Sequence, residues 1–189
     1  RSALSSHVRR VALEVTNQLG SAGPSRPIEI DADLRPEGKK GPLVRSLDSY
    51  AGYYDKWSEP WEAQALLRAR PIAGEQTLRD AFTELIDPLR YPDEVPESSL
   101  RQMRRLKARM ESERLPRGAD PNRHLKLGRG SLSDVEWTVQ LLQMQHAADN
   151  PHLRTTETLA ALDALLAAGE VGAEDAEILS EAWLLATGV

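Results

Sequence analysis

The chain has 189 residues, of which 40% are hydrophobic and 28% charged, a composition typical of a globular protein with one domain or two small ones. Its formal net charge of -5 gives no electrostatic reason to expect nucleic acid or an anionic membrane surface as a partner. The chain contains no cysteine, which excludes a disulfide scaffold and a thiolate zinc site and is compatible with the cytoplasm. No apolar run has the length of a transmembrane helix.

The first 46 residues contain one helical pattern and one strand pattern. The chain begins without Met, at RSALSSHVRRVALEV, and we therefore expect a piece of a longer polypeptide. Apolar residues at helical spacing predict an amphipathic helix over 4–19. Strict alternation of apolar and acidic residues over 28–35 predicts a half-buried strand, and the prolines and glycines of 36–42 predict a loop.

After this loop nearly every segment has a helical pattern. Pro60 suits the first turn of a helix that Pro71 ends, and Ser131 with Asp134 resembles a capping box with a shorter acid. The expected helices cover residues 47–57, 60–70, 77–86, 98–114, 131–148, 156–168 and 173–187. One strand followed by many helices predicts a mainly α chain, in which part of a mixed α/β domain leads into a helical bundle.

Three carboxylates occupy alternate positions of the predicted strand, at Glu29, Asp31 and Asp33. Alternate residues of a strand share a face and lie about 6.6 Å apart, so these like charges would repel unless a cation offset them. Mg²⁺ takes oxygen ligands of this kind and bridges to phosphates. A solvated strand face often carries acids too, and the alternation alone favours that simpler interpretation.

Basic residues mark two further candidate anion sites. Arg35, Lys39 and Lys40 follow the carboxylates directly and are candidate contacts for the phosphates of a nucleotide. Lys126 and Arg129 lie at a glycine-rich helix N-terminus that can receive an anion, although structural capping explains the same residues equally well.

The charge is also uneven along the chain. Residues 101–130 hold ten Lys and Arg against three acids, whereas residues 150–189 hold one Arg against seven acids. This asymmetry is compatible with a region that handles anions or docks a partner, and equally with a solvated basic helix face.

Three longer motifs occur in a fixed order: DADLRPEGKKGPLV (31–44), YYDKWSEPWEAQALLRARPIAG (53–74) and HLKLGRGSLSDVEWTVQLLQMQHA (124–147). Together they resemble the glutamine synthetase adenylyltransferase/adenylyl-removing family. The resemblance covers the chain from about residue 28 onward, which makes it far more specific than any single motif. The residues of the first motif resemble more closely the half of the enzyme that attaches AMP.

The resemblance implies a fold, an activity and a site. Residues 1–75 would be the C-terminal part of a nucleotidyltransferase palm, with one helix and one strand, and residues 76–189 a helical bundle. The enzyme would transfer AMP from ATP to a tyrosine of glutamine synthetase in the cytoplasm, or remove it by phosphorolysis, with Mg²⁺ as cofactor. Asp31 corresponds to the third metal-binding carboxylate of the palm and would also assist catalysis. Asp33 stands where many relatives carry a basic residue.

The first two carboxylates of the palm, in a Gly-Ser and Asp-x-Asp segment, are missing from the sequence, so we expect the chain alone to be inactive. Two other functions stay open. The bundle from about residue 76 would dock glutamine synthetase or the PII signalling protein as a binding module. Alternatively, the chain would be a relative of the uridylyltransferases that modify PII, whose palm chemistry is the same.

Overall fold

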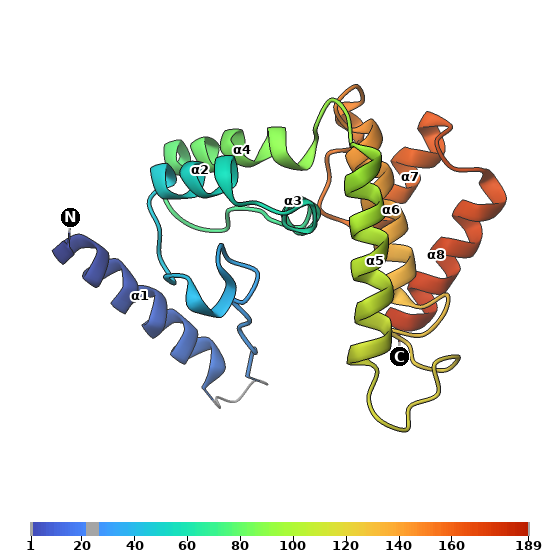
Figure 1. Cartoon of the computed structure of the whole chain (residues 1–189), viewed down its shortest axis with the longest axis horizontal. Coiled ribbons are helices and arrows are strands. Elements are labelled where there is room, and N and C mark those ends of the chain that lie inside the picture. Colours follow the sequence, from blue (N-terminus) through green and yellow to red (C-terminus); the bar gives the residue numbers. More distant parts are fainter. Residues whose placement is uncertain (1, 22–26, 189) are drawn as a thin grey trace. The chain divides into compact units, whose positions relative to one another are not determined.

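The computed structural model describes residues 2–21 and 27–188, and within these ranges the chain is helical, with no β-strand (Figure 1). The chain divides into two compact units, Arg1–Ser58 and Glu59–Val189. The expectation of a mainly α chain is confirmed. The predicted domain boundary between residues 75 and 76 stays a prediction.

The first unit contains α1 (Ser2–Gly20), the single-turn 3₁₀-helix η1 (Gly38–Lys40) and α2 (Leu47–Lys56). α1 is amphipathic, as predicted, but its apolar side chains are not covered: Val11 is 48% exposed and Val15 50%. Ser46 is the N-cap of α2, and its hydroxyl accepts the N–H of Ser49 at 3.3 Å.

The predicted strand over 28–35 is absent, and with it the α/β character expected of this unit. Residues 27–32 have no regular secondary structure, and a turn follows at Asp33 and Leu34. The N–H of Ile28 donates to the carbonyl of Leu19 at 2.9 Å instead of to a neighbouring strand. A strand needs a partner for its ladder of hydrogen bonds, and the described residues of this unit supply none. The alternating pattern predicted a strand, but the segment has no neighbouring strand with which to form hydrogen bonds.

The second unit consists of six α-helices and the 3₁₀-helix η2 (Pro151–Leu153) within the ranges that the structure covers. The helices are α3 (Pro60–Leu66), α4 (Gln76–Arg90), α5 (Glu97–Arg114), α6 (Leu132–His146), α7 (Thr158–Ala168) and α8 (Ala173–Thr187). They follow the predicted segments closely, with two exceptions: α3 ends at Leu66 rather than at residue 70, and α4 continues to Arg90 rather than ending at residue 86. The chain turns after α3 because the N–H of Ala69 donates to the carbonyl of Leu66 at 2.9 Å.

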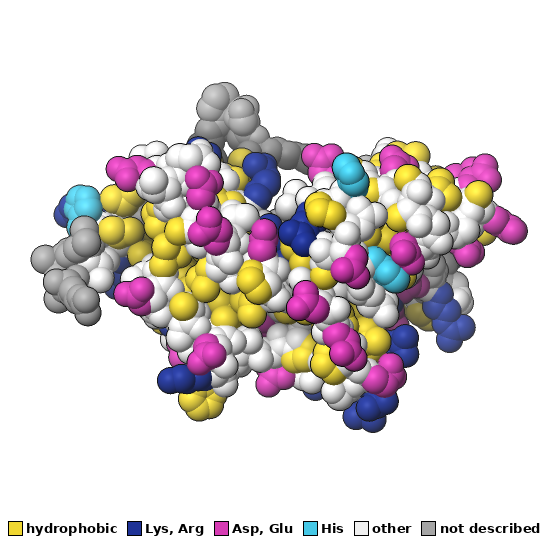
Figure 2. All heavy atoms as spheres, turned by 90° about the horizontal axis from the view of Figure 1, so that it is seen from above, with side chains coloured by type: hydrophobic (Ala, Val, Ile, Leu, Met, Phe, Trp, Pro, Cys, Tyr) yellow, Lys and Arg dark blue, Asp and Glu magenta, His cyan; other side chains and the backbone are white. Residues whose placement is uncertain are grey.

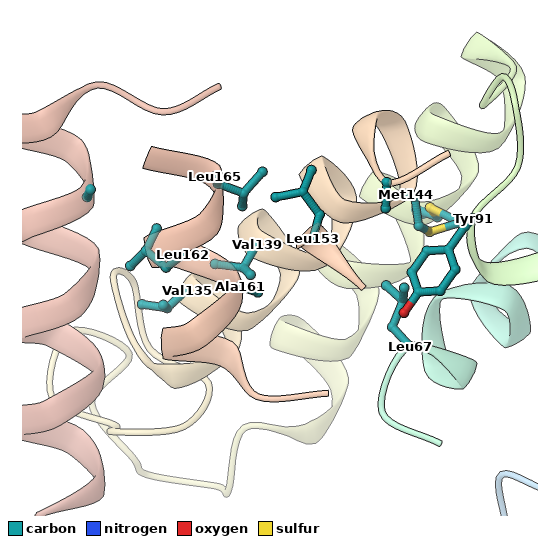
Figure 3. Packing of buried hydrophobic residues seen from close by; sticks show 12 residues of the cluster. Leu67, Tyr91, Val135, Val139, Met144, Leu153, Ala161, Leu162 and Leu165 are labelled. Atoms are coloured by element: carbon teal, nitrogen blue, oxygen red, sulfur yellow. The ribbon is translucent and has the colours of Figure 1, made fainter. Parts of the chain in front are cut away.

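The hydrophobic core of this unit lies where α6, α7 and α8 pack against one another, and Figure 3 shows its central side chains. Val135 and Val139 of α6 lie beside Leu162 and Leu165 of α7, and all four are at most 1% exposed. Each side chain of this size contributes about 1.5–3 kcal/mol when fully buried. The core therefore holds α6, which lies within the third motif.

Candidate functional site

The acidic segment after α1 carries the predicted metal ligands on exposed chain. The side chain of Asp31 accepts the N–H of Asp33 at 2.8 Å, which closes a turn, and Glu29 has no ion pair within the described ranges. No three or more His, Asp or Glu side chains gather into a metal-binding group in the part that the structure describes. Figure 2 likewise shows acidic side chains spread over the face in view. The three carboxylates do not meet because the strand that would align them is not formed.

Arg35 holds the loop that follows. Its guanidinium donates three hydrogen bonds to backbone carbonyls: from Nη1 to Ala32 at 2.6 Å, from Nε to Gly41 at 3.1 Å and from Nη2 to Lys39 at 3.2 Å. The planar fork of an arginine suits such a set of carbonyls, and a lysine could not reproduce it. In this geometry Arg35 fixes the loop, and its predicted contact with phosphate stays a prediction.

Gly41 is required by the same loop. A Cβ atom at this position would lie 2.0 Å from the carbonyl oxygen of Pro36, a backbone atom that cannot move aside, and Pro36 is itself buried. The first motif of the sequence therefore encodes a rigid loop: the arginine ties it, and the glycine permits its close approach.

The two lysines of the loop differ in their partners. Lys39 pairs with Asp33 at 3.2 Å, with the lysine largely exposed and the aspartate half-buried. Lys40 is exposed and has no ion pair with any residue that the structure describes. Among these described residues, Lys40 is therefore a free cation of the loop. Lys39 would have to leave the carboxylate of Asp33 before it could bind a phosphate.

Backbone carbonyls of the glycine-rich loop before α6 accept hydrogen bonds from N–H groups at the start of the helix. Ser131 is the N-cap, as predicted, but its hydroxyl makes no capping bond. The N–H of Leu132 donates to the carbonyl of Leu125 at 3.1 Å, and that of Ser133 to Lys126 at 3.2 Å. These two donors are thus already used, so an anion would be held by side chains. The predicted roles of the exposed Lys126 and of Arg129 stay predictions.

Gly128 allows this loop to close. A Cβ atom there would lie 2.6 Å from the carbonyl oxygens of both Pro121 and His124. The N–H of Gly128 itself donates to the carbonyl of His124 at 2.8 Å. The glycine at this point of the third motif is thus explained by backbone crowding without any ligand.

Asp134 fastens the loop to α5. Its carboxylate accepts the N–H of Gly130 at 2.6 Å and a hydrogen bond from Lys107, which also binds Glu111. Burial alone would raise the pKa of Asp134, but the bonds from Lys107 and Gly130 outweigh it and hold the pKa below its usual value. Burial would lower the pKa of Lys107, but its bonds to Asp134 and Glu111 outweigh this effect and raise the pKa.

This arrangement predicts an acid-dependent loss of stability. A carboxylate whose pKa is lower in the folded than in the unfolded chain stabilises the fold above its unfolded pKa near 3.8, and this contribution is lost as the pH falls toward the folded value. We expect Asp134→Asn to lower the free energy of unfolding at pH 7 by about 1–2 kcal/mol and to flatten its decline below about pH 5. Urea titrations from pH 7 to pH 3 measure both effects. Asp163→Asn, the same change at an exposed position of α7, should leave the pH profile unchanged; equal profiles for both variants would contradict the assignment.

A polar network joins the second and third motifs. Gln64 of α3 donates to Gln140 of α6 at 2.9 Å, and both side chains are buried. Arg68 pairs with Glu136 at 3.3 Å and donates to Thr158 of α7 at 2.7 Å. The sequence analysis missed this network, because no pattern within either motif indicates which residue of the other it meets. The motif residues Arg68, Glu136 and Gln140 therefore have a structural role in positioning α3 against α6 and α7.

Comparison with known proteins gives two family matches. Residues 4–85 match the family Glutamate-ammonia ligase adenylyltransferase, and residues 101–187 match GlnD PII-uridylyltransferase. No helix in the described ranges is both long and apolar enough to cross a membrane.

Curated relatives match across both units. The chain is 63% identical over 173 residues to the bifunctional glutamine synthetase adenylyltransferase/adenylyl-removing enzyme of Streptomyces avermitilis, covering 91% of this chain and 17% of the relative. It is 57% identical over 178 residues to the enzyme of the same name from Mycobacterium tuberculosis H37Rv, covering 94% of this chain and 18% of the relative. The resemblance drawn from the three motifs is confirmed, and the chain spans about a sixth of the length of these relatives.

Proposed function

We propose that this chain, as a relative of the bifunctional glutamine synthetase adenylyltransferase/adenylyl-removing enzymes, forms part of an enzyme that transfers AMP from ATP to a tyrosine of glutamine synthetase in the cytoplasm, or removes it by phosphorolysis. The observation that carries the proposal is the 63% identity to such an enzyme over 173 residues, because it extends through both compact units. A match confined to the helical unit would have left the chemistry open.

In this proposal Asp31 supplies one carboxylate ligand of a Mg²⁺ ion. Its position supports the role, since the side chain is exposed and has one oxygen engaged only by the N–H of Asp33. Bound magnesium would neutralise charge on the phosphoryl group that is transferred. The described residues bring no three carboxylates together, so the remaining ligands would come from other parts of a longer polypeptide. In that polypeptide, residues 28–33 would find the neighbouring strands that they lack here.

The loop tied by Arg35 would hold the phosphates beside this carboxylate. Lys40 is exposed without an ion pair in the described part of the chain and would donate to a phosphate oxygen of ATP. Lys39 would leave Asp33 to do the same, while Arg35 would keep the backbone in place. Asp31 would also accept the proton of the attacking tyrosine.

A chimeric enzyme tests the proposal. The matching segment of the Streptomyces avermitilis enzyme is replaced by this chain, and incorporation of labelled AMP into glutamine synthetase is measured, together with its phosphorolytic removal. We expect the chimera to retain at least one activity at a rate close to that of the parent. A folded chimera with neither activity would contradict the proposal, and the isolated chain is expected to show none.

A second candidate function is uridylyl transfer to the PII signalling protein, because residues 101–187 match the family GlnD PII-uridylyltransferase. This match covers the helical unit alone, whereas the adenylyltransferase match includes the Asp31 loop. The match to the uridylyltransferase family also favours the simpler possibility that the bundle docks PII or glutamine synthetase. An assay of the chimera with UTP and PII separates the two chemistries: label on PII would favour the second candidate.

A further inference from the structure

A groove of about 770 Å³ lies on the second unit, where α3 packs against α5. One side of the groove is a row of arginines, Arg101, Arg105 and Arg109, spaced four residues apart on α5. Their Cα atoms follow one another at about 6 Å along the helix axis, so the guanidinium groups project from one side of the helix. Like charges at this spacing repel, and a bound anion would offset the repulsion.

These arginines have few internal partners. Arg101 pairs with Glu97 at 3.4 Å, and both side chains are more than half exposed. The guanidinium groups of Arg105 and Arg109 have no ion pair or hydrogen bond with any residue that the structure describes. The acid in the lining, Glu59, accepts a hydrogen bond from Gln102 at 2.6 Å. The groove is therefore electropositive, with two uncommitted guanidinium groups.

Trp61 gives the groove an aromatic wall. This side chain lines the groove and is half-buried, whereas Trp137 and Trp183 pack against the hydrophobic core. Its place on α3 turns Trp61 toward α5. An indole face beside a row of arginines can stack on a planar base while the arginines bind phosphates.

We propose that this groove binds a nucleoside polyphosphate, with its base on Trp61 and its phosphates on Arg105 and Arg109. The volume falls in the range of small-molecule sites. The proposal does not rest on the proposed function, because every residue of the groove belongs to the second unit and none belongs to the Asp31 loop.

Calorimetric titration of the 189-residue chain with ATP, in EDTA to remove divalent metal, tests the proposal. ATP should bind more tightly than inorganic tripolyphosphate or adenosine. The double variant Arg105→Gln/Arg109→Gln should weaken ATP binding about tenfold or more. The matched control Arg104→Gln/Arg114→Gln removes the same charge from exposed positions of α5 outside the groove and should change the affinity less than about twofold.

Trp61→Leu should weaken ATP binding roughly tenfold and leave tripolyphosphate binding unchanged. Trp61→Phe, which keeps an aromatic face, should retain most of the affinity and covers the case in which the leucine variant fails to fold. Equal losses in the two double variants, or equal affinities for ATP and tripolyphosphate, would overturn the proposal. Loss of binding in Asp31→Asn alone would do so too, because it would place the nucleotide in the first unit. Binding of poly-glutamate without binding of ATP would identify an acidic protein as the ligand instead.

Discussion

Replacing Asp31 by Asn in the chimeric enzyme is expected to lower the rate of AMP transfer at least about 100-fold without changing the fold. Substitution of residues that only support a metal ligand typically costs about 10–100-fold, and a ligand itself should cost at least as much. The change is conservative for the loop, because an asparagine side-chain oxygen can still accept the N–H that Asp33 donates to Asp31 at 2.8 Å. What it removes is the charge that would bind magnesium.

The measurement is a steady-state assay of AMP incorporation over a range of Mg²⁺ concentrations, with circular dichroism as the check on folding. Asp48→Asn, an exposed aspartate in the first turn of α2, is the matched control and should retain the activity of the chimera. Full activity in Asp31→Asn would refute the metal-ligand role while leaving the family assignment intact. The two conclusions are thus tested separately.

The sequence predicted the helices well because their information is local. Apolar residues at helical spacing mark α6, and the spacing of Ser131 and Asp134 identified Ser131 as its N-cap. The strand over 28–35 failed for the opposite reason, since its existence depends on a neighbour rather than on its own residues. Alternation indicates which side chains would share a face, but it supplies no hydrogen-bond partner.

The chemistry of the candidate sites was less predictable than their location. The sequence correctly predicted a loop beside Arg35 and proposed a phosphate contact for this residue. Its three hydrogen bonds to backbone carbonyls depend on how that loop folds, which the sequence does not show. Likewise, the carbonyls of Leu125 and Lys126 reach the start of α6 only through the crowded turn at Gly128. A basic residue in a glycine-rich motif therefore has two physical uses, holding the backbone and holding an anion, which a sequence alone does not separate.

Contacts between distant motifs were not predictable at all. Gln64 and Gln140 are 76 residues apart and form a buried hydrogen bond. The sequence of neither segment predicts this bond. Such pairs depend on the packing of α3 against α6, which follows from the whole core. The family resemblance identified the residues, and the structure supplies the reason for them.

The largest expected effect on stability comes from Arg90, at the end of α4. The residue is 8% exposed, and its Nη1 atom donates to the carbonyls of Leu66 at 3.2 Å and Ala69 at 2.9 Å. Its Nη2 atom pairs with Asp87 at 2.8 Å, and its guanidinium carbon lies 4.9 Å from the centre of the Tyr91 ring. Arg90 thereby ties the end of α3 to α4 and to the core.

We expect Arg90→Met to lower the free energy of unfolding by about 3 kcal/mol, as measured by urea unfolding followed by circular dichroism. Methionine fills a similar length but leaves the carbonyl of Ala69 and a partly buried carboxylate without their donor, and it takes one of two donors from the carbonyl of Leu66, which costs far more than the lost packing. Arg104→Met makes the same chemical change at an exposed position of α5 and should stay within about 0.5 kcal/mol of the unmodified chain. A loss at Arg90 no larger than at Arg104 would show that the carbonyls find other donors, and that the join between α3 and α4 is held by apolar packing alone.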